Sequence, residues 1–130
     1  MTRILIADDN ALSRELVREI LDSPDYEVIA ARDGGEALDL IERTVPDLVL
    51  LDIQMPVQDG LSVIRQLRSE TRFADLPVIA LTAFAMRGDR ERALEAGFNS
   101  YTTKPIRPSL LREQVERHLA RRPANKPTDD

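Results

Sequence analysis

Short runs of apolar residues alternate with segments in which apolar residues recur every three or four positions. Five of the runs predict β-strands, at residues 3–8 (RILIAD), 26–31 (YEVIAA), 47–52 (DLVLLD), 77–82 (PVIALT) and 99–104 (NSYTTK). The last run is the least hydrophobic of the five. The intervening spacing predicts helices, marked by the apolar residues of 12–21, 37–41, 61–67, around 94, and 110–119.

Strands that alternate with helices pair in parallel through right-handed crossovers, with helices on both faces of the sheet. We therefore expect an α/β fold, a (βα)5 doubly wound sheet of five parallel strands. The order 2-1-3-4-5 is common for five such units, and it makes the first and third strands neighbours. Ligands bind to such sheets at the carboxyl ends of the strands, so the functional residues are expected there.

Composition adds limits to this picture. A chain of 130 residues with 42% hydrophobic content is the usual size of one domain. We expect that domain over residues 1–121 and a flexible tail over 122–130, because the segment RRPANKPTDD at 121–130 has two prolines and almost no apolar residues. The chain has no cysteine, and neither a leader nor a run of eighteen apolar residues is visible. These features predict a soluble cytoplasmic protein without membrane insertion, and a net charge of -5 argues against direct binding to DNA.

Three carboxylates are expected at one edge of the sheet. Asp8 and Asp9 follow the first strand in ILIADDN, and Asp52 ends the third strand in VLLDIQMP. At an assumed separation of about 5 Å and an effective dielectric constant near 20, each ionised pair repels by roughly 3 kcal/mol. Such a cluster needs a cation or raised pKa values. Since only oxygen ligands are at hand, Mg²⁺ is the cation that fits best.

Each acid taken alone has a simpler interpretation. Asp9 or Asn10 caps the first helix, with the cap favoured for Asp9, and Asp52 begins a turn ahead of Pro56. Asp52 is the harder to explain in this way, because a turn residue needs no apolar strand before it.

Two more strands end in complementary side chains, Thr82 after VIAL and Lys104 before Pro105. A hydroxyl, an ammonium group and a divalent cation aimed at one carboxylate would stabilise a transferring phosphoryl group, with Asp52 as its acceptor. The simpler interpretations are a helix cap for Thr82 and an ordinary turn at Lys104-Pro105.

Together these residues resemble the receiver domain of bacterial two-component response regulators, of the stand-alone, chemotaxis-regulator-like type with a flavodoxin-like fold. The resemblance covers about residues 3–120 and rests on four motifs: ADDN at 7–10, DIQMPVQDG at 52–60, LTA at 81–83 and KP at 104–105.

The resemblance implies that Asp52 accepts a phosphoryl group from the phosphohistidine of a histidine kinase or phosphotransfer protein. It implies a Mg²⁺ site, with Mn²⁺ able to substitute, made by Asp8, Asp9, Asp52 and the main-chain carbonyl of Gln54. Thr82 and Lys104 would contact the phosphoryl oxygens, and a cis peptide bond would join Lys104 to Pro105.

The resemblance also implies a switch. Thr82 would move toward the phosphoryl group, and Tyr101 would fill the space that it leaves, so that the face made by the fourth helix, fifth strand and fifth helix changes its binding to a downstream protein. The simpler interpretation of Tyr101 is an aromatic side chain packed at the sheet edge. We expect a monomer, or a weak dimer that depends on phosphorylation.

The chief alternative is a Mg²⁺-dependent phosphatase of the haloacid dehalogenase type. Such an enzyme needs a second carboxylate two residues after the nucleophile, for general acid and base catalysis, and that position here is Gln54. The interpretation as a nucleotide-binding protein has less support, since neither of the glycine-rich phosphate-binding motifs, G-x-x-x-x-G-K and G-x-G-x-x-G, occurs. A receiver used only as a scaffold is disfavoured because every reactive group is present. We therefore expect a signalling domain that assists only its own phosphorylation and slow dephosphorylation.

Overall fold

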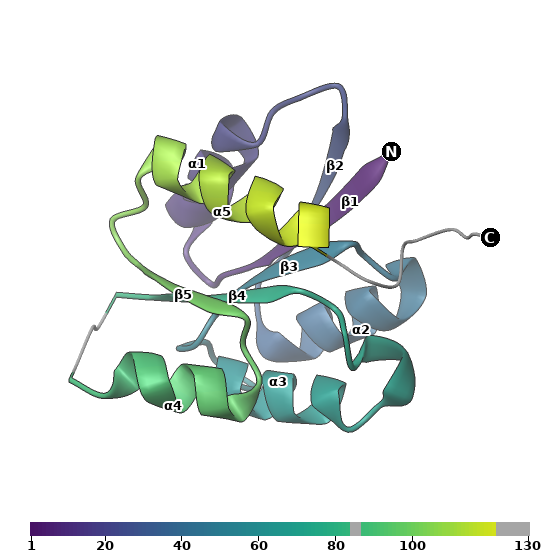
Figure 1. The fold of residues 1–130 in the computed structure, drawn as a ribbon, viewed down its shortest axis with the longest axis vertical. Helices are drawn as coiled ribbons and strands as arrows, with labels where there is room; N and C mark the ends of the chain where they lie inside the picture. Colours follow the sequence, from purple (N-terminus) through teal and green to yellow (C-terminus); the bar gives the residue numbers. More distant parts are fainter. Residues whose placement is uncertain (84–86, 122–130) are drawn as a thin grey trace.

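The computed structural model describes residues 1–83 and 87–121. In this part of the chain, five strands alternate with five α-helices (Figure 1). The strands are β1 (Thr2–Ala7), β2 (Tyr26–Ala31), β3 (Leu48–Asp52), β4 (Val78–Thr82) and β5 (Ser100–Thr103). The helices are α1 (Ala11–Ile20), α2 (Gly34–Thr44), α3 (Gly60–Arg68), α4 (Asp89–Ala96) and α5 (Pro108–Arg121), with a short 3₁₀ helix η1 (Thr71–Phe73). The α/β alternation is confirmed, and each strand lies within one residue of its predicted bounds at either end.

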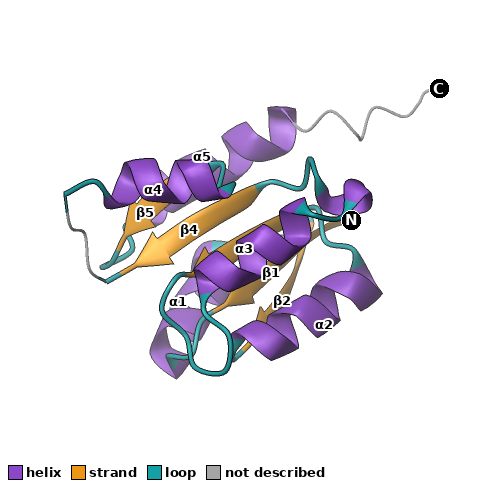
Figure 2. Cartoon of the chain, turned by 90° about the horizontal axis from the view of Figure 1, so that it is seen from below, coloured by secondary structure: helices purple, strands orange, loops and turns teal. Residues whose placement is uncertain are grey.

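All strand pairs are parallel, in the order β2-β1-β3-β4-β5. This confirms the predicted (βα)5 doubly wound sheet. Helices α1 and α5 cover one face of the sheet, and α2, α3 and α4 cover the other (Figure 1). The strand arrows point to one edge of the sheet (Figure 2), so the carboxyl ends of β1 and β3 meet there.

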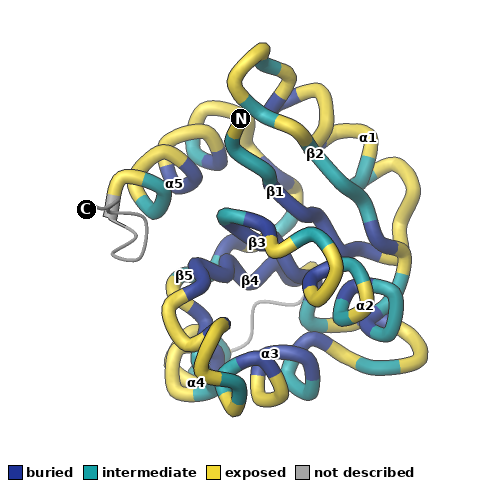
Figure 3. The backbone as a smooth tube through the Cα atoms, turned by 90° about the vertical axis from the view of Figure 1, so that its right-hand side faces the viewer, coloured by how far each residue is buried: buried dark blue, intermediate teal, exposed yellow. Residues whose placement is uncertain are grey.

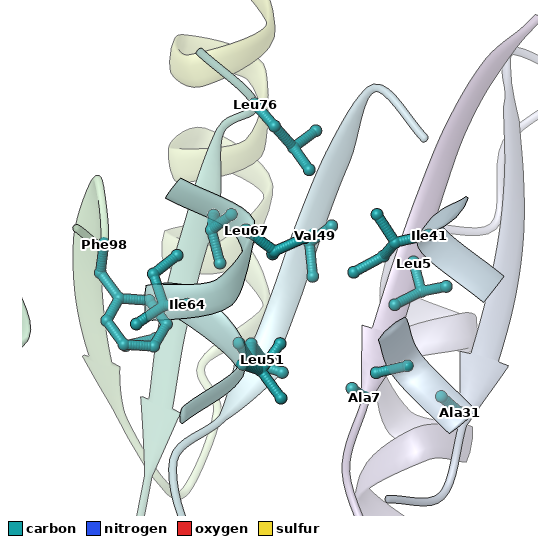
Figure 4. Packing of buried hydrophobic residues seen from close by; sticks show 14 of the residues in the cluster. Leu5, Ala7, Ala31, Ile41, Val49, Leu51, Ile64, Leu67, Leu76 and Phe98 are labelled. Carbon is teal, nitrogen blue, oxygen red and sulfur yellow. The ribbon is translucent and has the colours of Figure 1, made fainter. Parts of the chain in front are cut away.

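The sheet is buried on both faces because its central strands carry apolar residues at nearly every position. All five residues of β3 are buried, and buried positions are concentrated on the inner strands while the helices expose their outer turns (Figure 3). Alternate residues serve the two cores. Leu5, Ala7, Val49 and Leu51 belong to the core under α2 and α3 (Figure 4). Ile4, Ile6, Leu48 and Leu50 belong to the core under α1 and α5.

Side-chain caps fix where three helices begin. Asn10 accepts a hydrogen bond from the main-chain N–H of Ser13 at the start of α1, and Asp33 and Asp59 do the same for α2 and α3. The cap favoured for Asp9 is therefore wrong: one position along, Asn10 holds the cap. This leaves the Asp9 carboxylate available for another role.

The last helix reaches the end of the described residues. Helix α5 extends to Arg121, and the predicted tail at 122–130 lies outside the described residues, so the domain boundary stays a prediction. Among the described helices, none combines the length and the apolar character needed to cross a membrane.

Candidate functional site

The predicted acidic cluster forms at the carboxyl ends of β1 and β3. Ala7 pairs with Leu51 across these strands, so the residues that follow, Asp8 and Asp52, lie beside each other. Asp8 is fully buried and Asp52 is 3% exposed, whereas Asp9 is exposed. One oxygen from each of the three carboxylates lies within 4.8 Å of the others.

Main-chain N–H groups hold the two buried carboxylates in place. Oδ1 of Asp8 accepts a hydrogen bond of 2.9 Å from the N–H of Asn10, and Oδ1 of Asp52 accepts one of 3.0 Å from the N–H of Gln54. Each of these hydrogen bonds closes a short local turn. Asp52 therefore begins a turn, as its simpler interpretation predicted, and it also belongs to the acidic cluster. The other oxygen of each carboxylate, Oδ2, faces Lys104.

Lys104 supplies the positive charge that faces this pair. Its Nζ lies 2.8 Å from Oδ2 of Asp8 and 3.1 Å from Oδ2 of Asp52. The lysine reaches the site from the end of β5, and its main-chain N–H donates to the carbonyl of Thr82 at the end of β4. The Lys104-Pro105 peptide bond is cis, the isomer that the resemblance implied.

The charges of the site are coupled. Burial raises the pKa of Asp52 from 3.8 to about 6, and the charge of Asp8 adds to this rise, while the Gln54 N–H and Lys104 oppose it. Burial alone would lower the pKa of Lys104, but the carboxylates of Asp8 and Asp52 outweigh it, so this pKa is raised. Lys104 therefore stays protonated, and the carboxylate of Asp52 takes up a proton at a higher pH than an exposed aspartate does.

Thr82 ends β4 next to Asp52. Leu81 pairs with Asp52 in the sheet, so Thr82 is one position beyond the acid on the neighbouring strand, and its side chain is buried. Helix α4 begins at Asp89 with Gly88 at its N-cap. The interpretation of Thr82 as a helix cap is therefore wrong, and its hydroxyl belongs to the strand edge that carries the acids.

Tyr101 lies on the same face of the sheet as Thr82. It pairs with Ala80, which is two residues before Thr82 and so points the same way. The ring packs against the core under α2 and α3, and the hydroxyl oxygen is buried without a hydrogen-bond partner among the described residues. Burial and the charge of Asp89 raise the pKa of this hydroxyl. Edge packing, the simpler interpretation of Tyr101, thus describes its position, and a switching role stays a prediction.

The loop of residues 53–59 carries Gln54 and runs from β3 to α3. Two glycines allow its close approach to the rest of the site. A Cβ on Gly60 would lie 2.6 Å from the carbonyl oxygen of Asp52, and one on Gly34 would lie 1.9 Å from that of Gln58. The support from Gly34 was not predicted, since the pair Gly34-Gly35 reads as an ordinary helix start.

The donor set fits a hard divalent cation. It consists of carboxylate oxygens from three chain positions, and Oδ2 of the buried Asp8 has Lys104 Nζ, at 2.8 Å, as its ionic partner. Mg²⁺ prefers oxygen ligands and uses only one or two carboxylates beside water. The cluster could therefore bind such an ion.

The structure thus places buried acids, a hydroxyl group and a lysine at one edge of a parallel α/β sheet. The model of the response regulator receiver domain matches residues 4–116. The chain belongs to this family, as the sequence predicted, and it is a signalling domain of two-component systems.

Two relatives place the chain within the family. It is 41% identical over 116 residues to the polar-differentiation response regulator DivK of Brucella anthropi, covering 89% of this chain and 94% of that protein. DivK of Brucella ovis matches to the same extent.

Solved structures agree with the fold. The receiver domain of the sensor histidine kinase PA1611 from Pseudomonas aeruginosa is 36% identical with a TM-score of 0.83, covering 92% of this chain and 98% of that one. That structure has a magnesium ion coordinated in its active-site cleft. A response regulator from Chloroflexus aurantiacus is 33% identical with a TM-score of 0.87, at 92% and 98% coverage.

Proposed function

We propose that this chain is a phosphorylation-activated switch in which Asp52 accepts a phosphoryl group from the phosphohistidine of a histidine kinase or histidine phosphotransfer protein. The observation that carries the proposal is the position of Lys104, whose Nζ lies within 3.1 Å of both buried carboxylates. A lysine held there neutralises the acids at rest and is in reach of a phosphoryl group bound to Asp52.

The transfer is a direct displacement at phosphorus. One oxygen of the Asp52 carboxylate forms a bond to phosphorus while the phosphorus–nitrogen bond of the phosphohistidine breaks, and the imidazole leaves neutral when its other ring nitrogen carries a proton. Lys104 and the Thr82 hydroxyl bind the equatorial oxygens, which stabilises charge without proton transfer. The hydrogen bond from Gln54 N–H keeps the other oxygen of Asp52 turned away and orients the nucleophile.

Asp8, Asp9, Asp52 and the main-chain carbonyl of Gln54 would hold the metal ion. A bound Mg²⁺, or Mn²⁺ in its place, would offset the carboxylate charge and polarise the phosphoryl oxygens. Because ionised pairs at about 4.8 Å repel by about 3–4 kcal/mol at an effective dielectric constant near 20, the cluster gains stability from a cation.

Gln54 favours a lasting phosphoaspartate over turnover. A phosphatase of the haloacid dehalogenase type needs an acid–base group at this position, and an amide cannot exchange a proton in that way. We therefore assign the chain no activity on other substrates, only help with its own phosphorylation and slow dephosphorylation.

The output is a change of the surface formed by α4, β5 and α5. Phosphorylation adds close to two negative charges and new acceptor oxygens, which draw the Thr82 hydroxyl toward Asp52. Tyr101, on the same face, follows into the space that Thr82 leaves. This surface has a pocket of about 460 Å³, lined in part by Tyr101, Arg107 and Leu110, and we propose that a downstream protein binds there. The chain would act in the cytoplasm, as a monomer or a weak phosphorylation-dependent dimer.

Intact-mass spectrometry tests the proposal. The protein is incubated with acetyl phosphate or phosphoramidate and Mg²⁺, with and without a chelator. We expect a mass gain of one phosphoryl group that needs the metal and is absent from Asp52→Asn. Steady release of phosphate from a phosphomonoester, or a mass gain in Asp52→Asn equal to that of the wild type, would overturn the assignment.

A further inference from the structure

Arg14 connects helix α1 to the acidic edge of the sheet. Its side chain is half-buried, and Nη1 donates a hydrogen bond of 2.7 Å to the main-chain carbonyl of Asp8. The main-chain N–H of Arg14 donates to the carbonyl of Asn10, the residue that caps α1. Asn10 in turn donates its own N–H to Oδ1 of Asp8. The start of α1 is therefore tied to Asp8 at two points, one on its main chain and one on its side chain.

Asp8 and Asp9 differ in how they are held. The carboxylate and the main-chain carbonyl of Asp8 all have partners, and its N–H donates to the carbonyl of Ala31 on β2. The Asp9 carboxylate is exposed, and it makes no hydrogen bond or ion pair with any described residue. Its own contacts therefore do not fix the direction in which this third carboxylate of the cluster points.

The peptide group between Asp8 and Asp9 can supply that constraint. A peptide group is planar, so a hydrogen bond that fixes the Asp8 carbonyl also fixes the direction in which the chain continues to Cα of Asp9. Arg14 makes the hydrogen bond that holds this carbonyl. Its guanidinium group therefore acts on the exposed acid through the main chain and not by direct contact.

We propose that Arg14 is a positioning residue for the divalent cation, because it holds the Asp8–Asp9 peptide so that the Asp9 carboxylate faces the other two acids. The inference rests on the metal site of the proposed function. Loss of a partner that orients a metal ligand costs about 10–100-fold in metal affinity. The positive charge of Arg14 has the opposite effect, since a cation near the cluster repels another cation. The sign of the change in Mg²⁺ affinity therefore decides between positioning and charge.

Arg18 provides a matched control on the same helix. It lies one turn after Arg14, and its Nη1 donates to another main-chain carbonyl, that of Val28 in β2, at 3.3 Å. Val28 pairs with Ile4 in β1, so this contact anchors α1 to the sheet away from the acidic edge. Arg14→Met and Arg18→Met each remove one positive charge and one guanidinium hydrogen bond to the main chain.

The experiment compares wild type, Arg14→Met and Arg18→Met. The dissociation constant of Mg²⁺ is obtained from the rise of the urea midpoint with Mg²⁺ concentration, because a ligand that binds only the folded chain stabilises it by an amount that this constant sets. The rate of phosphorylation by phosphoramidate is then measured over the same range of Mg²⁺. This second measurement separates the Mg²⁺ concentration at half-maximal rate from the rate at saturating Mg²⁺.

We expect Arg14→Met to bind Mg²⁺ about tenfold more weakly than wild type, at the lower end of the range for lost partners of metal ligands. The Mg²⁺ concentration at half-maximal phosphorylation rate should rise by a similar factor. The rate at saturating Mg²⁺ should match the wild type, which is the pattern of a lost contribution to binding alone. Arg18→Met should match the wild type in both measurements.

An unchanged or lower Mg²⁺ dissociation constant in Arg14→Met would overturn the inference, since charge would then outweigh positioning. An equal weakening in Arg18→Met would also overturn it, because the effect would come from a loosened α1. So would a lower rate at saturating Mg²⁺ with an unchanged half-maximal concentration.

Failure of the proposed function gives different results. If the urea midpoint of the wild type does not rise with Mg²⁺, the proposed metal site is wrong and the inference is overturned with it. If the wild type binds Mg²⁺ but phosphoramidate does not label it, the proposed phosphoacceptor role is wrong, and the dissociation constants of the three chains still decide the role of Arg14.

Discussion

Replacing Asp52 by asparagine should stabilise the metal-free protein at neutral pH. The substitution removes a buried charge and keeps the size of the side chain, and the amide oxygen can still accept the hydrogen bond from Gln54 N–H. Lys104 keeps an ionic partner, because its Nζ also lies 2.8 Å from Asp8. The main change is therefore the loss of a carboxylate that the fold holds unfavourably.

The size and pH dependence of the effect follow from the raised pKa of Asp52. A rise from 3.8 to about 6 corresponds to about 3 kcal/mol, and screening by solvent at this edge site reduces the expected gain to about 1–2 kcal/mol. The folded state binds the proton more tightly than the unfolded state, so wild-type stability falls as the pH rises from about 4 to about 6 and stays lower above that range. The advantage of Asp52→Asn should be absent near pH 4 and complete near pH 7.

Urea unfolding in the presence of a chelator measures this difference, at several values between about pH 5 and about pH 7.5. Asp39→Asn is the control, because Asp39 is an exposed acid paired with Arg43 one helical turn away. The stability of this variant should be nearly unchanged at each pH. If Asp52→Asn is less stable than the wild type at pH 7.5, or if its advantage does not vary with pH, the account of a strained buried carboxylate is wrong.

Two other substitutions test how the site is supported. Lys104→Met removes the cation shared by the two buried carboxylates, so the free energy of unfolding in chelator should drop by about 2–4 kcal/mol; an unchanged urea midpoint would contradict this. In Gly34→Ala the new methyl group would lie 1.9 Å from the carbonyl oxygen of Gln58, so a loss of about 2–3 kcal/mol is expected. Gly35→Ala, where the nearest atom would be 3.4 Å away, should stay close to the wild type, and equal losses in both variants would refute the steric argument.

Much of the fold could be predicted because each part depends on neighbouring residues or on a general rule. The run at 47–52 is apolar throughout, as a strand buried on both faces requires, and β3 is buried at all five positions. Parallel pairing then followed from the alternation with helices, and it brought Asp8, Asp9 and Asp52 to one edge. The strand order itself was adopted as the common solution, since the residue pattern does not distinguish it from other orders.

The features that were missed depend on contacts between distant residues. Leu12 fits the apolar spacing of α1 but is largely exposed, and only Val17 and Ile20 of that helix are buried, because spacing does not show how wide a face the sheet covers. Arg68 looks like a solvent-facing helix residue, but its guanidinium donates hydrogen bonds to the carbonyls of Gly97 and Phe73. Gly97 is 29 residues away in the chain, so no local pattern could indicate that contact.

The most direct test of the central claim is to locate the phosphoryl group. The protein is phosphorylated with phosphoramidate and Mg²⁺, the acyl phosphate is reduced with borohydride, which converts a phosphorylated aspartate to homoserine, and the peptides are sequenced by mass spectrometry. The account predicts homoserine at position 52 alone, with none when a chelator is present. Homoserine at position 8 or 9, or an unmodified peptide around Asp52 in a protein that has gained phosphate, would contradict it.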